Sequence, residues 1–300
     1  MRVVILSKGP GNYSTKRLKE EILARGHQVR IIDYSKCYVT AERNNPLVRY
    51  QGETIVDVDV IIPRIAASIT KYGSAIVRQF EMQNVSTTTS SIAIARSRDK
   101  LRSMQLLAKA GVAIPKTVFA RETTDLEDVL EQVGGAPVII KVARGTQGNG
   151  VVLAETRKAA KAVMQAFYVE GVNFLVQEYI DESAGQDIRA FVVGGEVVAS
   201  MRRQNLDDDF RSNLHQGGTG EPVELTEGER KVALKAAKAI GLSICGVDMV
   251  RSKRGPLVLE VNCSPGFGIE HVTGINVAGK IIDYVEKNSQ GRQKKDRVGA

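Results

Sequence analysis

The order of strands and helices changes near Lys116, and this change limits the folds that the chain can form. Before that point, residues 2–6 (RVVIL) form a short apolar strand, and residues 14–26 follow as a helix that ends at Gly26. Two further strands come next, in the segments HQVRIID and DVDVIIPRI. Because strand, helix and strand alternate, we expect a parallel sheet in this part.

After Lys116 the strands are longer and some are joined by tight turns. Residues 187–203 contain two apolar runs around Gly194 and Gly195, a pattern typical of a β-hairpin. Residues 249–262 are a second candidate hairpin, with its turn at 253–255. The helices expected here are 125–133, 156–167, 226–240 and 275–287, the third opened by a capping box of Thr226 and Glu229. Antiparallel pairs should therefore dominate the second part.

These patterns predict an α/β and α+β protein of two domains and a tail. The segment 91–111 reads as one helix that links the domains and ends at Gly111. The predicted boundaries are 1–103 for an N-terminal α/β domain with the linker helix and 104–287 for the second domain, divided into a lid of about 116–185 and a core of about 186–287. Residues 288–300 carry four basic residues and one acidic residue, and we expect a disordered basic tail.

Composition and charge exclude several classes of protein. No apolar run approaches the roughly 18 residues that a membrane helix needs, and the first ten residues lack a signal-peptide core, so we expect a soluble cytoplasmic protein without a membrane partner. The three cysteines form no C-x-x-C pair, and the three histidines are far apart. The net charge of +8 could attract nucleic acid, an acidic peptide or a polyanionic substrate. Because no nucleic-acid-binding motif is present, we expect no direct nucleic-acid partner.

Three oxygen-bearing side chains near the second hairpin are candidate metal ligands. Glu260 and Asn262 are two positions apart on a strand, so both should point to one face. Asp248 lies near them if the strands pair about the turn at 253–255. Oxygen ligands without nitrogen or sulfur suit Mg²⁺ or Mn²⁺ bound together with nucleotide phosphates. The alternative is a polar strand face in solvent.

A glycine-rich segment, IIKVARGTQGNGVVL at residues 139–153, suggests a phosphate site. Lys141 precedes the glycines on a predicted strand, whereas the lysine of a P-loop follows them. Its ammonium group could lie over two phosphates, with the loop as a movable lid. A simple hairpin turn is the alternative. At 174–180 (FLVQEYI), Glu178 and Tyr179 could offer backbone groups to an adenine edge, and Asp187 is suitably placed for ribose hydroxyls.

Together these residues resemble the ATP-grasp superfamily, in which two α+β lobes hold ATP between antiparallel sheets. The resemblance is more specific in ARSRDKLRSMQLLAKAGVAIPKT, KVARGTQGNGVVLAET, DFRSNLHQGG and LEVNCSPG. These segments are similar to those of RimK-type ligases, which add glutamate to the carboxyl terminus of small-subunit ribosomal protein S-six. The similarity extends over about residues 1–287. It implies an ATP-grasp fold behind an N-terminal α/β pre-ATP-grasp domain.

The resemblance also implies roles for particular residues. Those bound to the nucleotide are Lys100 and Lys141 at the phosphates, Glu178 and Tyr179 at adenine, Asp187 at the ribose, and Arg211, Ser212 and Asn213, which close the site. Those bound to two divalent ions, Mg²⁺ or Mn²⁺, are Asp248, Glu260 and Asn262. We expect Arg203 and Arg211 to be catalytic, and these arginines together with Arg202 and Arg64 could bind substrate carboxylates.

The implied activity is ATP-dependent ligation of a carboxylate to an amine through an acyl phosphate. The expected partners are L-glutamate and the acidic C-terminal tail of a ribosomal protein, with one glutamate or an oligo-glutamate chain as product, and we expect a homo-oligomer. Two alternatives remain open at this point. One is an ATP-grasp ligase that joins glutamate to a coenzyme or another carrier. The other is a non-catalytic ATP-binding regulator on the same scaffold, in the manner of synapsin.

Overall fold

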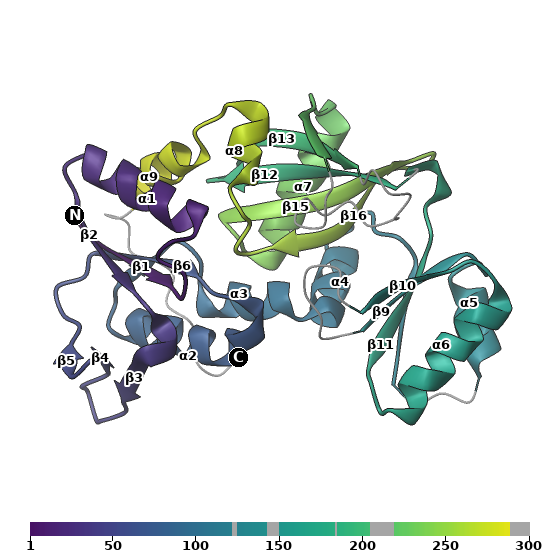
Figure 1. Ribbon diagram of the computed structural model, residues 1–300, viewed down its shortest axis with the longest axis horizontal. Coiled ribbons are helices and arrows are strands. Elements are labelled where there is room, and N and C mark those ends of the chain that lie inside the picture. Colours follow the sequence, from purple (N-terminus) through teal and green to yellow (C-terminus); the bar gives the residue numbers. More distant parts are fainter. Residues whose placement is uncertain (122–124, 143–149, 184, 205–218, 289–300) are drawn as a thin grey trace.

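The computed structural model describes residues 1–121, 125–142, 150–183, 185–204 and 219–288 (Figure 1). Three of the segments considered above lie outside the described residues: the glycine loop at 143–149, residues 211–213 and the tail from 289. The described residues form three main sheets, which follow one another along the chain. None of the helices in the described ranges is both long and apolar enough to cross a membrane.

The N-terminal sheet is parallel, as the alternation of strands and helices predicts. Its strand order is β2-β1-β6-β7. The strands are β1 (Arg2–Ser7), β2 (Gln28–Ile32), β6 (Val60–Arg64) and β7 (Ser86–Thr87). The helices packed around them are α1 (Tyr13–Ala24), α2 (Thr70–Met82) and α3 (Ser91–Arg98). Since both faces of β1 and β6 are covered, these strands are almost entirely apolar and buried.

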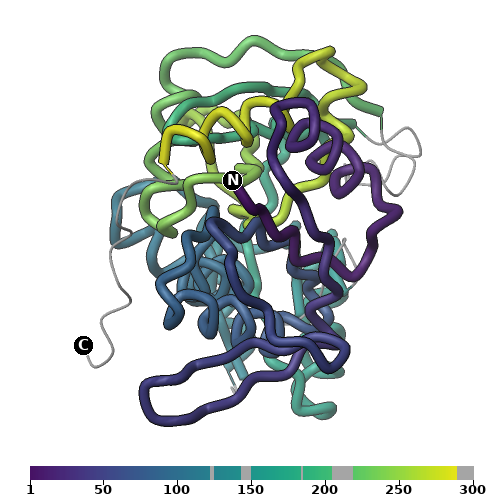
Figure 2. The backbone as a smooth tube through the Cα atoms, turned by 90° about the vertical axis from the view of Figure 1, so that its left-hand side faces the viewer, coloured from purple at the N-terminus to yellow at the C-terminus, as the bar shows by residue number. Residues whose placement is uncertain are grey.

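A small antiparallel sheet between β2 and β6 is absent from the sequence-based prediction. It consists of β3 (Cys37–Thr40), β4 (Leu47–Tyr50) and β5 (Glu53–Thr54), and it follows the short helix η1 (Tyr34–Lys36). The Gln79 side chain on α2 holds it by donating to the carbonyl oxygens of Thr40 and Leu47. Figure 2 shows the β3–β4 hairpin extending from the lower end of the molecule.

The predicted helix 91–111 is wrong, because Asp99 divides it into two. Asp99 adopts an extended conformation, and its side chain accepts a hydrogen bond from the Arg102 amide. That bond caps the second helix, α4 (Lys100–Lys109). The chain therefore changes direction between Arg98 and Lys100.

The lid sheet is antiparallel, with strand order β10-β9-β11-β8. Its strands are β8 (Thr117–Ala120), β9 (Val138–Val142), β10 (Val151–Ala154) and β11 (Phe174–Glu178). Helices α5 (Leu126–Gln132) and α6 (Arg157–Val169) cover its outer face (Figure 1). Because side chains alternate along a strand, Ile140 and Val176 face these helices, whereas Lys141 and Gln177 face the other way.

The central sheet contains both predicted hairpins, in the order β14-β13-β12-β15-β16. The strands are β12 (Gln186–Val193), β13 (Glu196–Gln204), β14 (Thr219–Pro222), β15 (Ile244–Ser252) and β16 (Gly255–Asn262). One face packs on α7 (Glu227–Ile240), which begins with the predicted capping box. The last described elements are α8 (Gly268–Thr273), beside β13, and α9 (Val277–Asn288), beside α1 (Figure 1).

The second face of the central sheet is divided into an apolar half and a charged half. In the apolar half, Phe191 and Met201 share a core with α9 and with Val3 and Ile5 of the N-terminal sheet. Further along the same strands this face carries charged residues: Asp187, Arg189, Arg203, Asp248 and Glu260. The position of this charged half is fixed because the apolar half anchors the sheet.

Candidate active site

Two lysines from different elements meet at the end of β9. The Lys100 ammonium group, at the first turn of α4, donates to the carbonyl oxygen of Val142 at 2.9 Å. Lys141, on β9 itself, donates to Oε1 of Gln177 on β11 at 2.7 Å. Gln177 donates in turn to the Thr117 hydroxyl at 2.8 Å, which fixes its amide. The structure therefore brings together the two lysines that were predicted to bind phosphates.

Burial has shifted both lysines toward their neutral forms. It lowers the pKa of Lys141 to about 8, an effect that the Glu260 carboxylate opposes and the Lys100 charge increases. Burial also lowers the pKa of Lys100, again opposed by Glu260. These three side chains thus form one electrostatic cluster that joins the lid sheet, α4 and the central sheet. An anion placed there would restore the positive charge of the lysines.

Asp248 and Glu260 face each other across the β15–β16 pair. The register aligns Asp248 with Glu260 and Gly246 with Asn262, so the three candidate metal ligands share one face. This confirms the geometric part of the prediction, which assumed pairing about the hairpin turn. A bulge between Asp248 and Met249 follows directly after the pair.

Two arginines compensate Asp248, whereas Glu260 has no ion-pair partner among the described residues. Asp248 is buried and accepts a bidentate pair from Arg189, at 2.7 Å from Nε and 2.6 Å from Nη2. Arg203 adds a third contact, from Nη2 to Oδ2 at 2.9 Å. In contrast, Glu260 accepts no hydrogen bond from the described part of the chain, and its side chain reaches solvent.

The two carboxylates differ in acidity for the same reason. Burial alone would raise the pKa of Asp248, but Arg189 and Arg203 hold it well below its usual range. Although the Glu260 side chain is exposed at its end, the surrounding protein removes water from its carboxylate and raises its pKa, and the Asp248 charge raises it further. When a carboxylate has its pKa raised by a neighbouring negative charge, a cation that enters between the two stabilises its ionised form.

The donor set fits a hard divalent cation such as Mg²⁺. Glu260 offers two oxygens, Asp248 faces it, and Asn262 follows on the same face with Oδ1 bonded to the Ser264 amide at 3.0 Å. Within the ranges that the structure describes, no cluster of three or more His, Cys, Asp or Glu side chains could hold a metal ion. The set combines two carboxylates with one amide, and its remaining ligands would be phosphate oxygens and water.

The residues predicted at adenine and ribose are held by other protein groups. Glu178 accepts from the Lys116 amide at 2.7 Å and from Arg254 at 2.6 Å, which links the lid to the β15–β16 turn. Tyr179 follows it and is half-buried. Asp187 accepts a bidentate pair from Arg203, at 2.7 Å from Nε. Their contacts with a nucleotide stay predictions.

The arginines predicted to bind substrate have different surroundings. Arg203 is only 2% exposed and lies between Asp187 and Asp248, so it positions these carboxylates. Its contact with a substrate stays a prediction. Arg202 points to the opposite face of the sheet and pairs with Glu221. Arg211, Ser212 and Asn213 lie outside the described residues.

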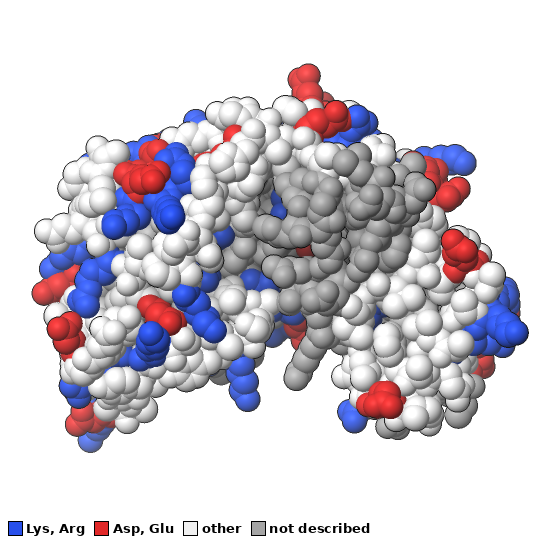
Figure 3. Space-filling model, in the orientation of Figure 1, with Lys and Arg blue, Asp and Glu red and all other residues white. Residues whose placement is uncertain are grey.

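Sequence reasoning missed Arg189 and Gln177, the partners of Asp248 and Lys141. A signal for Arg189 was present, because it is a charged residue two positions after Asp187 on the same strand, directly before the apolar run 190–193. Among the residues coloured in Figure 3, charges of both signs are interspersed on this face.

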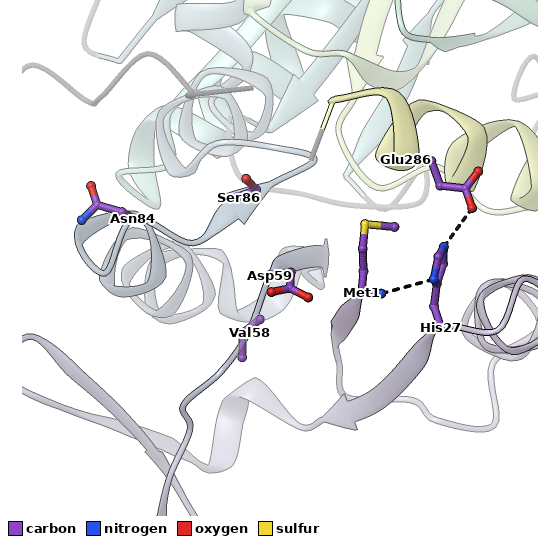
Figure 4. Close-up of a pocket in the computed structure, with 7 residues that line it drawn as sticks. All are labelled: Met1, His27, Val58, Asp59, Asn84, Ser86 and Glu286. Carbon is purple, nitrogen blue, oxygen red and sulfur yellow. Dashed lines mark hydrogen bonds and ion pairs between the residues drawn. The ribbon is translucent and has the colours of Figure 1, made fainter. Parts of the chain in front are cut away.

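A hollow lies at the other end of the N-terminal sheet. It has a volume of about 590 Å³ and is lined by Met1, His27, Val58, Asp59, Asn84, Ser86 and Glu286 (Figure 4). Figure 4 shows His27 between the Met1 amino group and Glu286 of α9, at 3.3 Å and 2.8 Å. These residues surround the amino end of β1, whereas ligands of open α/β sheets bind at carboxyl ends. His27 therefore serves to hold α9 to the sheet.

The two antiparallel sheets, with Lys141 on one, the carboxylates on the other and Lys100 on α4 beside them, define an ATP-grasp fold. Solved structures agree over nearly the whole chain. The ATP-grasp ligase PsnB, complexed with a minimal precursor, superposes with a TM-score of 0.75 at 21% identity, covering 95% of this chain and 98% of that one. D-alanine–D-alanine ligase from Bacillus anthracis gives a TM-score of 0.67 at 17% identity, covering 96% and 97%.

The chain belongs to the RimK-like ATP-grasp family and is an ATP-grasp ligase. Residues 1–94 match the RimK PreATP-grasp domain, and residues 97–285 match the RimK-like ATP-grasp domain. Relatives from Teredinibacter turnerae and Vibrio cholerae, each named probable alpha-L-glutamate ligase, are 53% identical over 298 residues, or 99% of both chains. One from Picosynechococcus, with the same name, is 53% identical over 299 residues.

Proposed function

We propose that this ligase adds L-glutamate to the C-terminal glutamate of an acidic protein tail, that of a ribosomal protein of the S-six type. The observation that carries the proposal is the cluster of Lys100, Lys141, Asp248 and Glu260, which joins two cations to two facing carboxylates. Glutamate is proposed as the amine substrate because the relatives are named probable alpha-L-glutamate ligase. A peptide acceptor fits this fold, because PsnB was solved with its precursor peptide.

In the proposed reaction, the acceptor carboxylate attacks the γ-phosphate of ATP, the bond to the bridging oxygen breaks, and an acyl phosphate and ADP form. The amine of free glutamate then attacks the acyl carbon, and phosphate leaves as the amide forms. Lys100 and Lys141 bind the phosphates and become fully protonated beside them. Arg189 and Arg203 hold the Asp248 carboxylate in one orientation. The protein thus contributes position and charge rather than a covalent bond.

Asp248, Glu260 and Asn262 would hold Mg²⁺ or Mn²⁺, two ions on the family pattern. A bound divalent ion would neutralise charge on the transferred phosphoryl group. The ATP-grasp ligase PsnB was also solved with Mg and ADP, which supports magnesium as the ion. The neighbouring lysines explain why a site with only two carboxylates suffices, since they share the neutralisation of the phosphates.

Mass spectrometry of an acceptor peptide tests the proposal. The peptide should copy an acidic tail that ends in glutamate and should be incubated with ATP, Mg²⁺ and L-glutamate. We expect its mass to increase by one or more glutamyl residues. A control peptide with an amidated C-terminus should stay unchanged, because it has no reacting carboxylate.

A second series replaces the acceptor by small glutamate-bearing compounds or other carrier tails. Glutamylation of a small compound, with none of the peptide, would refute the protein acceptor while retaining the ligase. ATP hydrolysis without any glutamylated product in the whole series would refute glutamate as the amine substrate.

A further inference from the structure

Two arginines lie beside the candidate metal ligands without a carboxylate partner in the described residues. Arg64 is the last residue of β6, at the carboxyl edge of the N-terminal sheet. Arg98 is the last residue of α3. Both side chains are half-buried and therefore still reachable from solvent. Neither takes part in an ion pair with a described Asp or Glu, unlike Arg189 and Arg203.

The contacts of Arg64 orient its guanidinium group without neutralising it. Its Nη2 donates to the Pro265 carbonyl oxygen at 2.6 Å. Its guanidinium carbon lies 5.0 Å from the centre of the Phe267 ring. Burial, together with the positive charge of Arg98, lowers the pKa of Arg64 to about 10. The two guanidinium groups are therefore close enough to repel each other.

Arg98 also has spare hydrogen-bonding capacity. Its Nη2 donates to the Ile65 carbonyl oxygen at 2.8 Å. Its Nε is buried and has no hydrogen-bond partner. A guanidinium carries five N–H donors, and only one on each arginine is used by the described residues. A pair of like charges with unused donors is costly unless an anion completes it.

The position of this pair relates it to the reaction. Pro265, which holds Arg64, comes three residues after Asn262. The Ser97 hydroxyl, next to Arg98, donates to the Val261 carbonyl oxygen at 2.6 Å and accepts from the Cys263 amide at 3.2 Å. The end of α3 is thus attached to the strand that carries Glu260 and Asn262. An anion held by both arginines would lie beside the proposed site of phosphoryl transfer.

We propose that Arg64 and Arg98 form a subsite for a carboxylate that does not react, on one of the two glutamyl substrates. The inference rests on the proposed function, because ligation of glutamate to a C-terminal glutamate leaves such carboxylates on both substrates. The planar forks of two arginines suit a carboxylate, which each can bind through two parallel hydrogen bonds. Free glutamate and the acceptor tail share this chemistry, and the kinetic test distinguishes them.

Substrate discrimination provides the test. Wild type, Arg64→Lys and Arg98→Gln should be compared with L-glutamate against L-glutamine, and with acceptor peptides ending in glutamate against glutamine. Wild type should prefer the carboxylate form of the substrate that uses the subsite. The variants should lose roughly 10- to 100-fold in kcat/KM for that form, with little change for the amide. The KM for ATP should stay unchanged.

Each outcome of the kinetic test has a definite meaning. If the variants no longer distinguish L-glutamate from L-glutamine, the subsite binds the free amino acid. If they no longer distinguish peptides ending in glutamate from those ending in glutamine, it binds the acceptor. Equal losses for carboxylate and amide forms would indicate a structural role and overturn the proposal, as would a raised KM for ATP alone. Arg78→Gln is the matched control for Arg98→Gln. It removes one arginine charge from an exposed position on α2.

A binding measurement separates this proposal from the proposed function. Calorimetric titration of glutarate, with Mg²⁺ and ADP present, requires no turnover. Binding by wild type and Arg78→Gln, with at least tenfold weaker binding by both subsite variants, supports the subsite even if no glutamylated product forms. If wild type makes product while all variants bind glutarate alike and keep their discrimination, the subsite is refuted and the ligase function stands.

Discussion

At the scale of single residues, Asp248 and Glu260 are neighbours with opposite energetic roles. Asp248 has two arginine partners, whereas the pKa of Glu260 is raised by partial loss of water around its carboxylate and by the Asp248 charge. Glu260→Gln should therefore leave the melting temperature unchanged or higher. Ligation should fall by roughly 10²–10³ or more, because one preorganised charge is lost. Steady-state kinetics and thermal unfolding measure both effects, and near-normal turnover would remove Glu260 from the site.

Asp248→Asn is the matching change, with the opposite effect on stability. It leaves the buried Arg203 and the half-buried Arg189 with one counter-charge fewer. Removing one partner of a buried ion pair costs about 3–5 kcal/mol. We therefore expect a clear loss of unfolding free energy in denaturant titrations. A stability equal to that of Glu260→Gln would show that the arginines do not depend on Asp248.

Lys141 should make nucleotide binding depend on pH. Its pKa in the free protein is lowered to about 8, and bound phosphates should raise it. Affinity should therefore be fully present below pH 8. As the pH rises above 8, the free protein loses the proton that the complex keeps, and affinity should fall by up to about tenfold per pH unit. Calorimetric titration with ADP and Mg²⁺ measures this slope.

Lys141→Arg is the control for that measurement. Arginine keeps its charge over the whole range, so the variant should bind with a flatter pH dependence, whatever its absolute affinity. An equally steep slope in Lys141→Arg would assign the titration to another group, of which Lys100 is the nearest.

The sequence located single residues only where a local rule applies. The two-residue period of a strand put Glu260 and Asn262 on one face, and the hairpin turn brought Asp248 opposite. Arg189 was missed because it meets Asp248 through pairing of β12 with β15, two strands far apart in sequence. Nothing local fixes that register. The same holds for Gln177, which reaches Lys141 across β9 and β11.

At the scale of elements, Asp99 directs two basic residues to different parts of the molecule. It ends α3 after Arg98 and caps α4 before Lys100. The apolar spacing continues across the break, which is why periodicity alone predicts one helix over 91–111. The β3–β5 sheet was missed for a related reason, since its strands are short and partly exposed. Helices α1, α5, α6, α7 and α9 and both hairpins follow strong patterns and were predicted, whereas α2 was missed.

Asp99→Ala should affect both stability and kinetics. Loss of an N-cap costs about 1 kcal/mol, and it frees the turn that places Lys100. We expect a raised KM for ATP together with the lower stability. Thr226→Ala is the control, because it removes the cap of α7 at a similar cost but lies on an element without predicted site residues. Unchanged ATP kinetics in Asp99→Ala would separate the cap from the position of Lys100.

At the scale of the whole molecule, the hydrophobic cores do not follow the three sheets. Two clusters join the N-terminal sheet to the central sheet, one including Leu6 with Val247 and the other Ile5 with Phe191. The core of the lid is separate, since its described members all lie between residues 118 and 176. The N-terminal and central sheets should therefore unfold as one unit, whereas the lid can open or unfold by itself.

Native-state hydrogen exchange at increasing denaturant tests this division. Amides of β9 and β11 should exchange through an opening of lower free energy than those of β1 and β15. Bound nucleotide should reduce this difference in opening free energy, because it would bridge Lys141 on the lid and Glu260 on the central sheet. Bound at about a hundredfold excess over Kd, it stabilises the closed lid by about 2.7 kcal/mol. If β9 and β15 exchange together without nucleotide, the lid is not an independent unit, and closure must occur by smaller movements within one cooperative body.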